Sequence, residues 1–207
     1  GRQVSQELLI ETLWPDSEGD AAIQSLYTTT HRLRKLLSET AVVMEDGRLS
    51  LDARYIWVDN LAFLRIAGKL QEILSAQQEQ DQGTVQRLAE QFFHLYQGDF
   101  LGAGERHFAY APMQEKLHLR FLKLTVLMGQ YWQQLGQAER CIECYERALE
   151  IDPVAEEFYQ ALMSSYSEVG RDSDAVMLFK RCRKNLSNIL GISPSKATMK
   201  IYNSIQS

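Results

Sequence analysis

The sequence has few cysteines, no long apolar run and no excess of basic residues, and each absence excludes a class of protein. Its three cysteines among 207 residues are too few, and odd in number, for a disulfide-linked secreted domain. No stretch reaches the ~18 consecutive apolar residues of a membrane span. The N-terminus lacks the basic start and apolar block of a signal peptide. We therefore expect a protein of the cytoplasm that has no membrane partner.

The overall charge also limits the possible partners. The net charge of −5 argues against a protein that is covered with basic surface for nucleic acid. A local basic face remains compatible with this value, because DNA binding depends on one face and not on the whole chain. Apolar residues make up 45% of the chain, which is enough for a packed core in one or two domains.

Motifs for catalysis, cofactors and metals are equally scarce. Cys141-x-x-Cys144 is a single pair inside a predicted helix, and no second Cys or His pair follows at zinc spacing, so packed helix cysteines are the favoured interpretation. The histidines form no HExxH pattern, and no glycine-rich loop ends in Lys-Ser/Thr. These histidines are His31, His94, His107 and His118. The sequence thus predicts no enzyme, no cofactor and no bound metal.

Two amphipathic helices and a hairpin are predicted near the N-terminus. The first helix spans Val4 to Leu13, with Ser5 as its N-cap, and Pro15 with the polar run after it breaks the pattern. The second helix spans Ala21 to Leu37. Asp46-Gly47 then lies between short apolar stretches, which predicts a hairpin over residues 42–51 with a type I′ turn.

The second helix has two distinct faces. Apolar residues recur at spacings of three and four, namely Ile23, Leu26, Thr30, Leu33 and Leu37. The opposite face carries Gln24, Thr28, His31, Arg32 and Lys35, with Arg34 on its flank. From the residues alone, a nucleic-acid-binding face and a solvated helix face are equally good interpretations.

From Asp59 onward the pattern is helical. We expect helices over residues 61–74, 85–96 and 113–135, a polar exposed loop over residues 77–83, and an interruption over residues 98–104. The clearest signal is an internal repeat that begins at Trp132. Residues 34 positions apart match in size, namely Trp132 with Tyr166, Gly136 with Gly170, Cys141 with Ala175, Tyr145 with Phe179, and Ala148 with Cys182. This is the period of tetratricopeptide repeats, which usually present a surface to a partner.

Several sequence patterns now stand in a specific order. VSQELLIETLWPD begins at Val4, THRLRKLL at Thr30 and LYQGDFL at Leu95, and the repeat and NILGISPS (from Asn188) follow. In this order they resemble the bacterial transcriptional activator domain of SARP-type and AfsR-like regulators. In that family an OmpR-like winged helix precedes a tetratricopeptide-like domain. The family's winged helix begins upstream of the segment that matches Val4, so we expect this chain to be the C-terminal part of a longer protein.

The resemblance implies a fold, a division into domains and a set of contacts. The fold would be all-α, a tetratricopeptide-like helical repeat (an α–α superhelix), with a small N-terminal partial winged-helix unit containing a β-hairpin. Residues 1–57 would form the partial winged helix, and residues 58–207 the transcriptional activator domain. Promoter DNA would meet Gln24, Thr28, His31, Arg32, Arg34 and Lys35 on the recognition helix and Arg48 on the wing. The helical repeat would bind a protein partner, receive a signal or self-associate.

A second hypothesis is a protein-interaction scaffold of a larger signalling protein, in which the winged helix packs and does not bind DNA. Residues 1–60 contain six basic and ten acidic side chains. DNA-binding units usually neutralise several phosphates with basic groups. The wing offers Arg48 beside Glu45 and Asp46. The acidic balance therefore favours the scaffold, whereas the order of the patterns favours the regulator.

Overall fold

The computed structural model describes residues 3–76, 81–98, 100 and 110–206. The chain divides into two compact units. The described residues of the first are 3–62 and 110–112, and those of the second are 63–76, 81–98, 100 and 113–206. None of the described helices is long and apolar enough to span a membrane.

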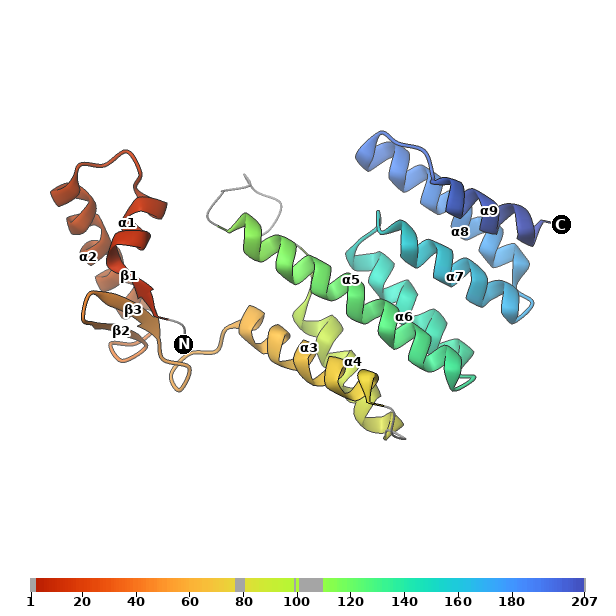
Figure 1. Ribbon diagram of the computed structural model, residues 1–207, viewed down its shortest axis with the longest axis horizontal. Helices are drawn as coiled ribbons and strands as arrows, with labels where there is room; N and C mark the ends of the chain where they lie inside the picture. Colours follow the sequence, from red (N-terminus) through yellow and green to blue (C-terminus); the bar gives the residue numbers. More distant parts are fainter. Residues whose placement is uncertain (1–2, 77–80, 99, 101–109, 207) are drawn as a thin grey trace. The chain divides into compact units, whose positions relative to one another are not determined.

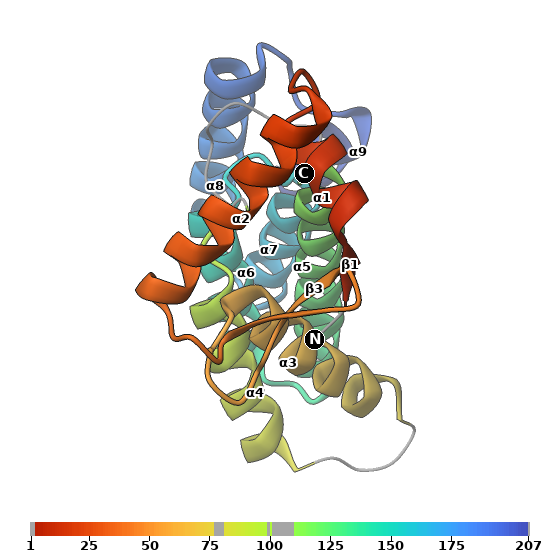
Figure 2. The same ribbon diagram turned by 90° about the vertical axis from the view of Figure 1, so that its left-hand side faces the viewer.

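The first unit combines two helices with a three-stranded antiparallel sheet (Figure 1, Figure 2). In chain order its elements are β1 (Val4–Ser5), α1 (Gln6–Leu13), α2 (Gly19–Leu36), β2 (Val42–Glu45) and β3 (Arg48–Leu51). The strand order is β1-β3-β2, so the hairpin strand β3 lies in the centre.

The start of the first helix differs from the prediction. Val4 was expected to belong to the helix, but Val4 and Ser5 pair with Leu49 and Arg48 of β3. This pairing is non-local, and a helical periodicity cannot indicate it. The cap was predicted correctly, because the Ser5 side chain accepts a hydrogen bond from the Leu8 amide at 3.2 Å.

The hairpin follows the prediction from Asp-Gly. Asp46 and Gly47 both have positive φ, at 48° and 69°, as a type I′ turn requires. Its strands pair from Val42 with Leu51 to Glu45 with Arg48. The turn is also tied to the start of α1, because the Gln6 amide donates to the Gly47 carbonyl at 2.9 Å.

The buried face of α2 is narrower than predicted. Ala22, Leu26 and Thr30 are buried at spacings of four. Ile23 and Leu37, which we expected on the apolar face, are 38% and 49% exposed. Ile23 lies beside the buried row, and Leu37 lies beyond the last residue of α2 as its C-cap.

The second unit consists of helices in succession (Figure 1). They are α3 (Asp59–Ser75), α4 (Gln82–Leu95), α5 (Ala111–Gln134), α6 (Ala138–Ile151), α7 (Glu156–Glu168), α8 (Asp172–Asn185), the π-helical turn η1 (Leu186–Leu190) and α9 (Lys196–Ile205). The expected loop over residues 77–83 extended too far, because α4 already begins at Gln82. The Asp81 carboxylate caps α4 by accepting from the Gly83 and Thr84 amides, so these residues are helical.

The internal repeat is confirmed by two matching helix ends. The Gly136 amide donates to Gln133, and the Gln137 amide donates to Trp132. The same two bonds recur 34 positions later at Gly170 and Arg171. Both glycines have positive φ, at 66° and 75°, which completes a Schellman motif at the end of α5 and of α7. The other four matched pairs are buried.

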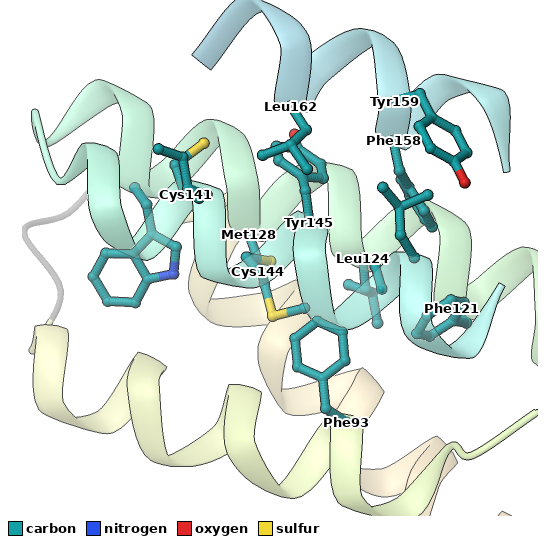
Figure 3. Close-up of a cluster of buried hydrophobic side chains, with 14 of the residues drawn as sticks. Phe93, Phe121, Leu124, Met128, Cys141, Cys144, Tyr145, Phe158, Tyr159 and Leu162 are labelled. Carbon is teal, nitrogen blue, oxygen red and sulfur yellow. The ribbon is translucent and has the colours of Figure 1, made fainter. Parts of the chain in front are cut away.

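The core of this unit is aromatic and runs through consecutive helices (Figure 3). Phe121 of α5 stacks on Tyr96 at 4.5 Å between ring centroids and meets Phe158 of α7 edge-on at 6.0 Å. Tyr145 of α6 lies against Gly129 of α5, where a side chain would have no room. The core therefore joins helices α3 to α8 into one packed body.

Candidate nucleic-acid interface

The outward face of α2 carries most of the predicted DNA-binding residues. Gln24, His31, Arg32 and Lys35 are exposed, and Thr28 is half-buried. Their spacings of three and four place them on one side of the helix, away from the buried row of Ala22, Leu26 and Thr30. Within the described residues, none of the four exposed side chains takes part in a side-chain hydrogen bond or an ion pair.

Arg34 has a different environment from the other cations of α2. It is half-buried, and its Nε donates a hydrogen bond to the Val42 carbonyl at 2.9 Å. This bond fixes the start of β2 against α2 and so holds the hairpin beside the helix. The prediction placed Arg34 on the flank of the polar face, and the structure gives it a structural contact there.

The wing carries little free positive charge. Arg48 is exposed and lies directly across from Glu45, with Asp46 in the turn. Beyond the hairpin, Arg54 pairs with Asp52 at 2.6 Å. The side-chain hydrogen bonds from Arg54 lower the pKa of Asp52 to about 2, so this pair stays charged and internally neutralised over the whole neutral range.

Tyr27 is a residue that the sequence analysis did not single out. It is 49% exposed and lies four residues before His31, on the edge of the polar face. A tyrosine hydroxyl can donate to a phosphate oxygen. Its position three residues after Gln24 was the available signal, but Tyr27 was assigned to neither face of the helix.

The cysteines have packing roles, whereas the histidines outside α2 differ in their surroundings. Cys141 and Cys144 are buried in α6, where their sulfurs approach the Ser165 hydroxyl and the Thr125 carbonyl. Burial raises the pKa of both thiols, which disfavours the thiolate that metal and redox chemistry need. His118 lies between the Tyr96 hydroxyl and Asp152. His94 is exposed, and His107 lies outside the described residues.

Residues 58–206 match the protein family described as bacterial transcriptional activator domain. The chain belongs to this family. The match covers well over half of the chain, and the resemblance that the sequence patterns suggested is thereby confirmed.

Two relatives of this chain, both regulators by name, are similar to it over nearly its whole length. Transcriptional regulator RedD of Streptomyces coelicolor is 28% identical over 205 residues, which cover 94% of this chain and 57% of RedD. Regulatory protein AfsR of Streptomyces griseus is 21% identical over 194 residues, which cover 94% of this chain and 20% of AfsR. The chain thus spans little more than half of one relative and a fifth of the other.

A solved structure shares the fold. Mycobacterium tuberculosis EmbR, solved in complex with a low affinity phosphopeptide, matches with a TM-score of 0.62 at 20% identity. The match covers 100% of this chain and 55% of that of EmbR. The predicted fold class, a helical repeat with a small N-terminal partial winged-helix unit, is therefore confirmed.

Proposed function

We propose that this chain is a module of a transcriptional regulator that binds promoter DNA through α2. Residues 1–57 form its partial winged helix, and residues 58–207 form the helical domain that binds a protein partner or signal, or self-associates. In this proposal α2 enters the major groove, and the β2–β3 hairpin lies along the backbone as a wing. The family is one of transcriptional regulators, and we propose no catalytic activity.

The outward face of α2 is the observation that carries this proposal. A recognition helix needs exposed side chains that have no partners within the protein, and this face provides them. Gln24, Thr28 and His31 would reach base edges, because amide, hydroxyl and imidazole groups match the hydrogen-bonding pattern of the major groove. Arg32 and Lys35 would bind guanines or phosphates.

Two further arginines would have supporting roles. Arg34 would add a phosphate contact from its terminal nitrogens while its Nε holds the hairpin. Arg48 would give the wing its contact to the DNA backbone. The printed names of RedD and AfsR, a transcriptional regulator and a regulatory protein, support a role in regulation.

The acidic balance of the first unit supports a second candidate, a scaffold that does not bind DNA. Of its basic side chains, Arg54 is neutralised by Asp52, and Arg34 is engaged with the backbone of β2. Fewer than the six basic side chains of residues 1–60 are therefore free to contact phosphates. The two candidates differ in a simple observable, which is affinity for a DNA duplex at low salt.

Reversing the charge of Arg32 and Lys35, the two exposed cations of α2, is expected to weaken DNA binding. We expect the double variant Arg32→Glu/Lys35→Glu to bind a labelled duplex of mixed sequence at least about tenfold more weakly than the unaltered chain, because each lost contact to a base or phosphate contributes on the order of 1–3 kcal/mol. Fluorescence anisotropy at several salt concentrations measures both the affinity and its salt slope. The slope of the logarithm of the binding constant against the logarithm of the salt concentration should become shallower by about 0.9 for each lost phosphate contact.

The matched control is Arg183→Glu/Lys184→Glu, at the end of α8. It makes the same charge change at two exposed cations of the helical unit. We expect this control to bind DNA nearly as well as the unaltered chain. Equal weakening by both double variants would show that binding depends on overall charge alone. Absence of binding by the unaltered chain even at low salt would favour the scaffold.

A further inference from the structure

A pocket lies between helices α4, α5 and α6 of the helical unit, which contains none of the proposed DNA contacts. Its open space, including the mouth to solvent, is about 390 Å³. Ala89 and Phe93 of α4, Trp132 of α5 and Cys144 of α6 form an apolar wall. Figure 3 shows Phe93 pointing from α4 toward Cys144, at the inner end of this wall.

Two arginines of α6 complete the lining. Arg140 and Arg147 are seven residues apart, so they lie two turns apart on one face of the helix. The guanidinium carbon of Arg140 lies 4.8 Å from the centroid of the Trp132 ring, and that of Arg147 lies 4.8 Å from the Phe93 ring. Stacking on aromatic rings holds each planar guanidinium in place and leaves its edge for hydrogen bonds.

These two cations have no anionic partner among the residues that the structure describes. None of the ion pairs among the described residues includes Arg140 or Arg147. The Nη1 of Arg140 is shielded from solvent and has no hydrogen-bond acceptor. An unsatisfied buried donor, above all a charged one, is costly and calls for an explanation. Glu143, one turn from each arginine on α6, is exposed and pairs with neither.

We propose that this pocket binds a small organic acid. The carboxylate would accept hydrogen bonds from Arg140 and Arg147, whose forked donors match two oxygens. An apolar or aromatic body would lie against the wall formed by Phe93, Trp132 and Cys144. This combination of apolar walls with few polar groups that orient a ligand is typical of small-molecule sites.

The two exposed glutamates of the pocket lining, Glu90 and Glu143, favour an organic acid over an inorganic anion. Glu90 and Glu143 lie at the lining and oppose the charge of the two arginines. A simple anion such as phosphate therefore gains little from electrostatics alone, and burial of an apolar body must supply part of the affinity. The proposal does not depend on DNA binding by α2, because every residue of the pocket belongs to the helical unit.

Titration of the full chain with benzoate, inorganic phosphate and benzyl alcohol tests the proposal. Nuclear magnetic resonance of the Trp132 indole N–H and of the arginine Nε–H groups reports on the pocket directly. We expect benzoate to shift these signals and to saturate, phosphate to bind more weakly, and benzyl alcohol, which has no carboxylate, not to bind. Phosphate binding as tight as that of benzoate, or binding of benzyl alcohol equal to that of benzoate, would overturn the proposal.

Three variants separate the site from a general effect of charge. Arg140→Gln/Arg147→Gln should weaken benzoate at least about tenfold, since each lost charged hydrogen bond is worth more than a factor of ten. The control Arg183→Gln/Lys184→Gln removes the same charge from α8 and should bind benzoate normally. Glu143→Gln removes the repulsion at the rim and should bind benzoate more tightly, a gain that misfolding cannot imitate. Unchanged affinity in both pocket variants would show that the site lies elsewhere.

Discussion

Replacing Phe121 by alanine is expected to lower the free energy of unfolding of the helical unit by about 3–5 kcal/mol. The side chain is fully buried, with 0% of its surface exposed. Its ring contacts Tyr96 and Phe92 on one side and Phe158 on another, with centroid separations of 4.5, 5.8 and 6.0 Å. Truncation would leave a cavity at the junction of α4, α5 and α7 and remove these ring contacts, together with the edge-on contact to Phe93 at 6.2 Å. Urea unfolding followed by far-ultraviolet circular dichroism measures the loss.

Two comparison variants set the scale for this measurement. Phe121→Leu keeps most of the buried volume and should cost much less than the alanine variant. Leu119→Ala, two residues away on the same helix, changes a side chain that is 56% exposed and should have little effect. A loss in Phe121→Ala no larger than that in Leu119→Ala would contradict the placement of Phe121 at the centre of the aromatic core.

Replacing Gly129 by alanine is expected to destabilise the same unit by about 2–3 kcal/mol. A Cβ at this position would lie 2.2 Å from both Cζ and Oη of Tyr145, far inside van der Waals contact. Both residues are buried between α5 and α6, so the tyrosine ring or one of the two helices must shift to relieve this contact. Alanine favours the helix intrinsically by up to about 1 kcal/mol, and the expected loss is what remains after that gain.

The chain offers a matched glycine for comparison. Gly68 in α3 also lies inside a helix, but an added Cβ there would meet nothing within 4 Å. Gly68→Ala should therefore stabilise the unit by about 0.5–1 kcal/mol, by helix propensity alone. Adding Tyr145→Ala to Gly129→Ala should cost less than the sum of the two single changes, because the clash is removed. Stabilisation by Gly129→Ala would mean that α5 and α6 do not approach closely here.

Local signals explain which parts of the fold the sequence could predict. Asp46-Gly47 predicts its hairpin because few other residue pairs adopt two consecutive positive φ angles. The repeat from Trp132 was recognisable because Gly136 and Gly170 end equivalent helices with the same hydrogen bonds. These features depend on residues that are close in sequence or repeated at a fixed interval.

The features that were missed depend on contacts between distant segments. Val4 was predicted to be helical because its strand partner, Leu49, lies forty-five residues further along the chain. The bond from Arg34 to the Val42 carbonyl could not be foreseen, because it requires the hairpin to lie against α2. One local feature was also missed: α9 was not predicted separately, although Ser195 caps it by accepting a hydrogen bond from the Thr198 amide.

The candidate sites illustrate the same division. The outward polar face of α2, which we propose binds DNA, could be predicted because its residues share one helix and its period is visible in the sequence. Exposure of Ile23 and Tyr27 on the same helix could not, because it depends on how little of the helix the small sheet covers. The pocket of Arg140 and Arg147 combines side chains of three helices, and no motif links them.

Mapping of backbone amides by nuclear magnetic resonance during addition of a DNA duplex tests the central claim most directly. If α2 is the DNA reader, the largest changes will fall on Gln24, Thr28, His31, Arg32 and Lys35 and on the hairpin around Arg48, while amides of α6 to α9 stay unchanged. Changes concentrated in the helical unit, or none at all at low salt, would contradict the account and leave the scaffold as the better description of the chain.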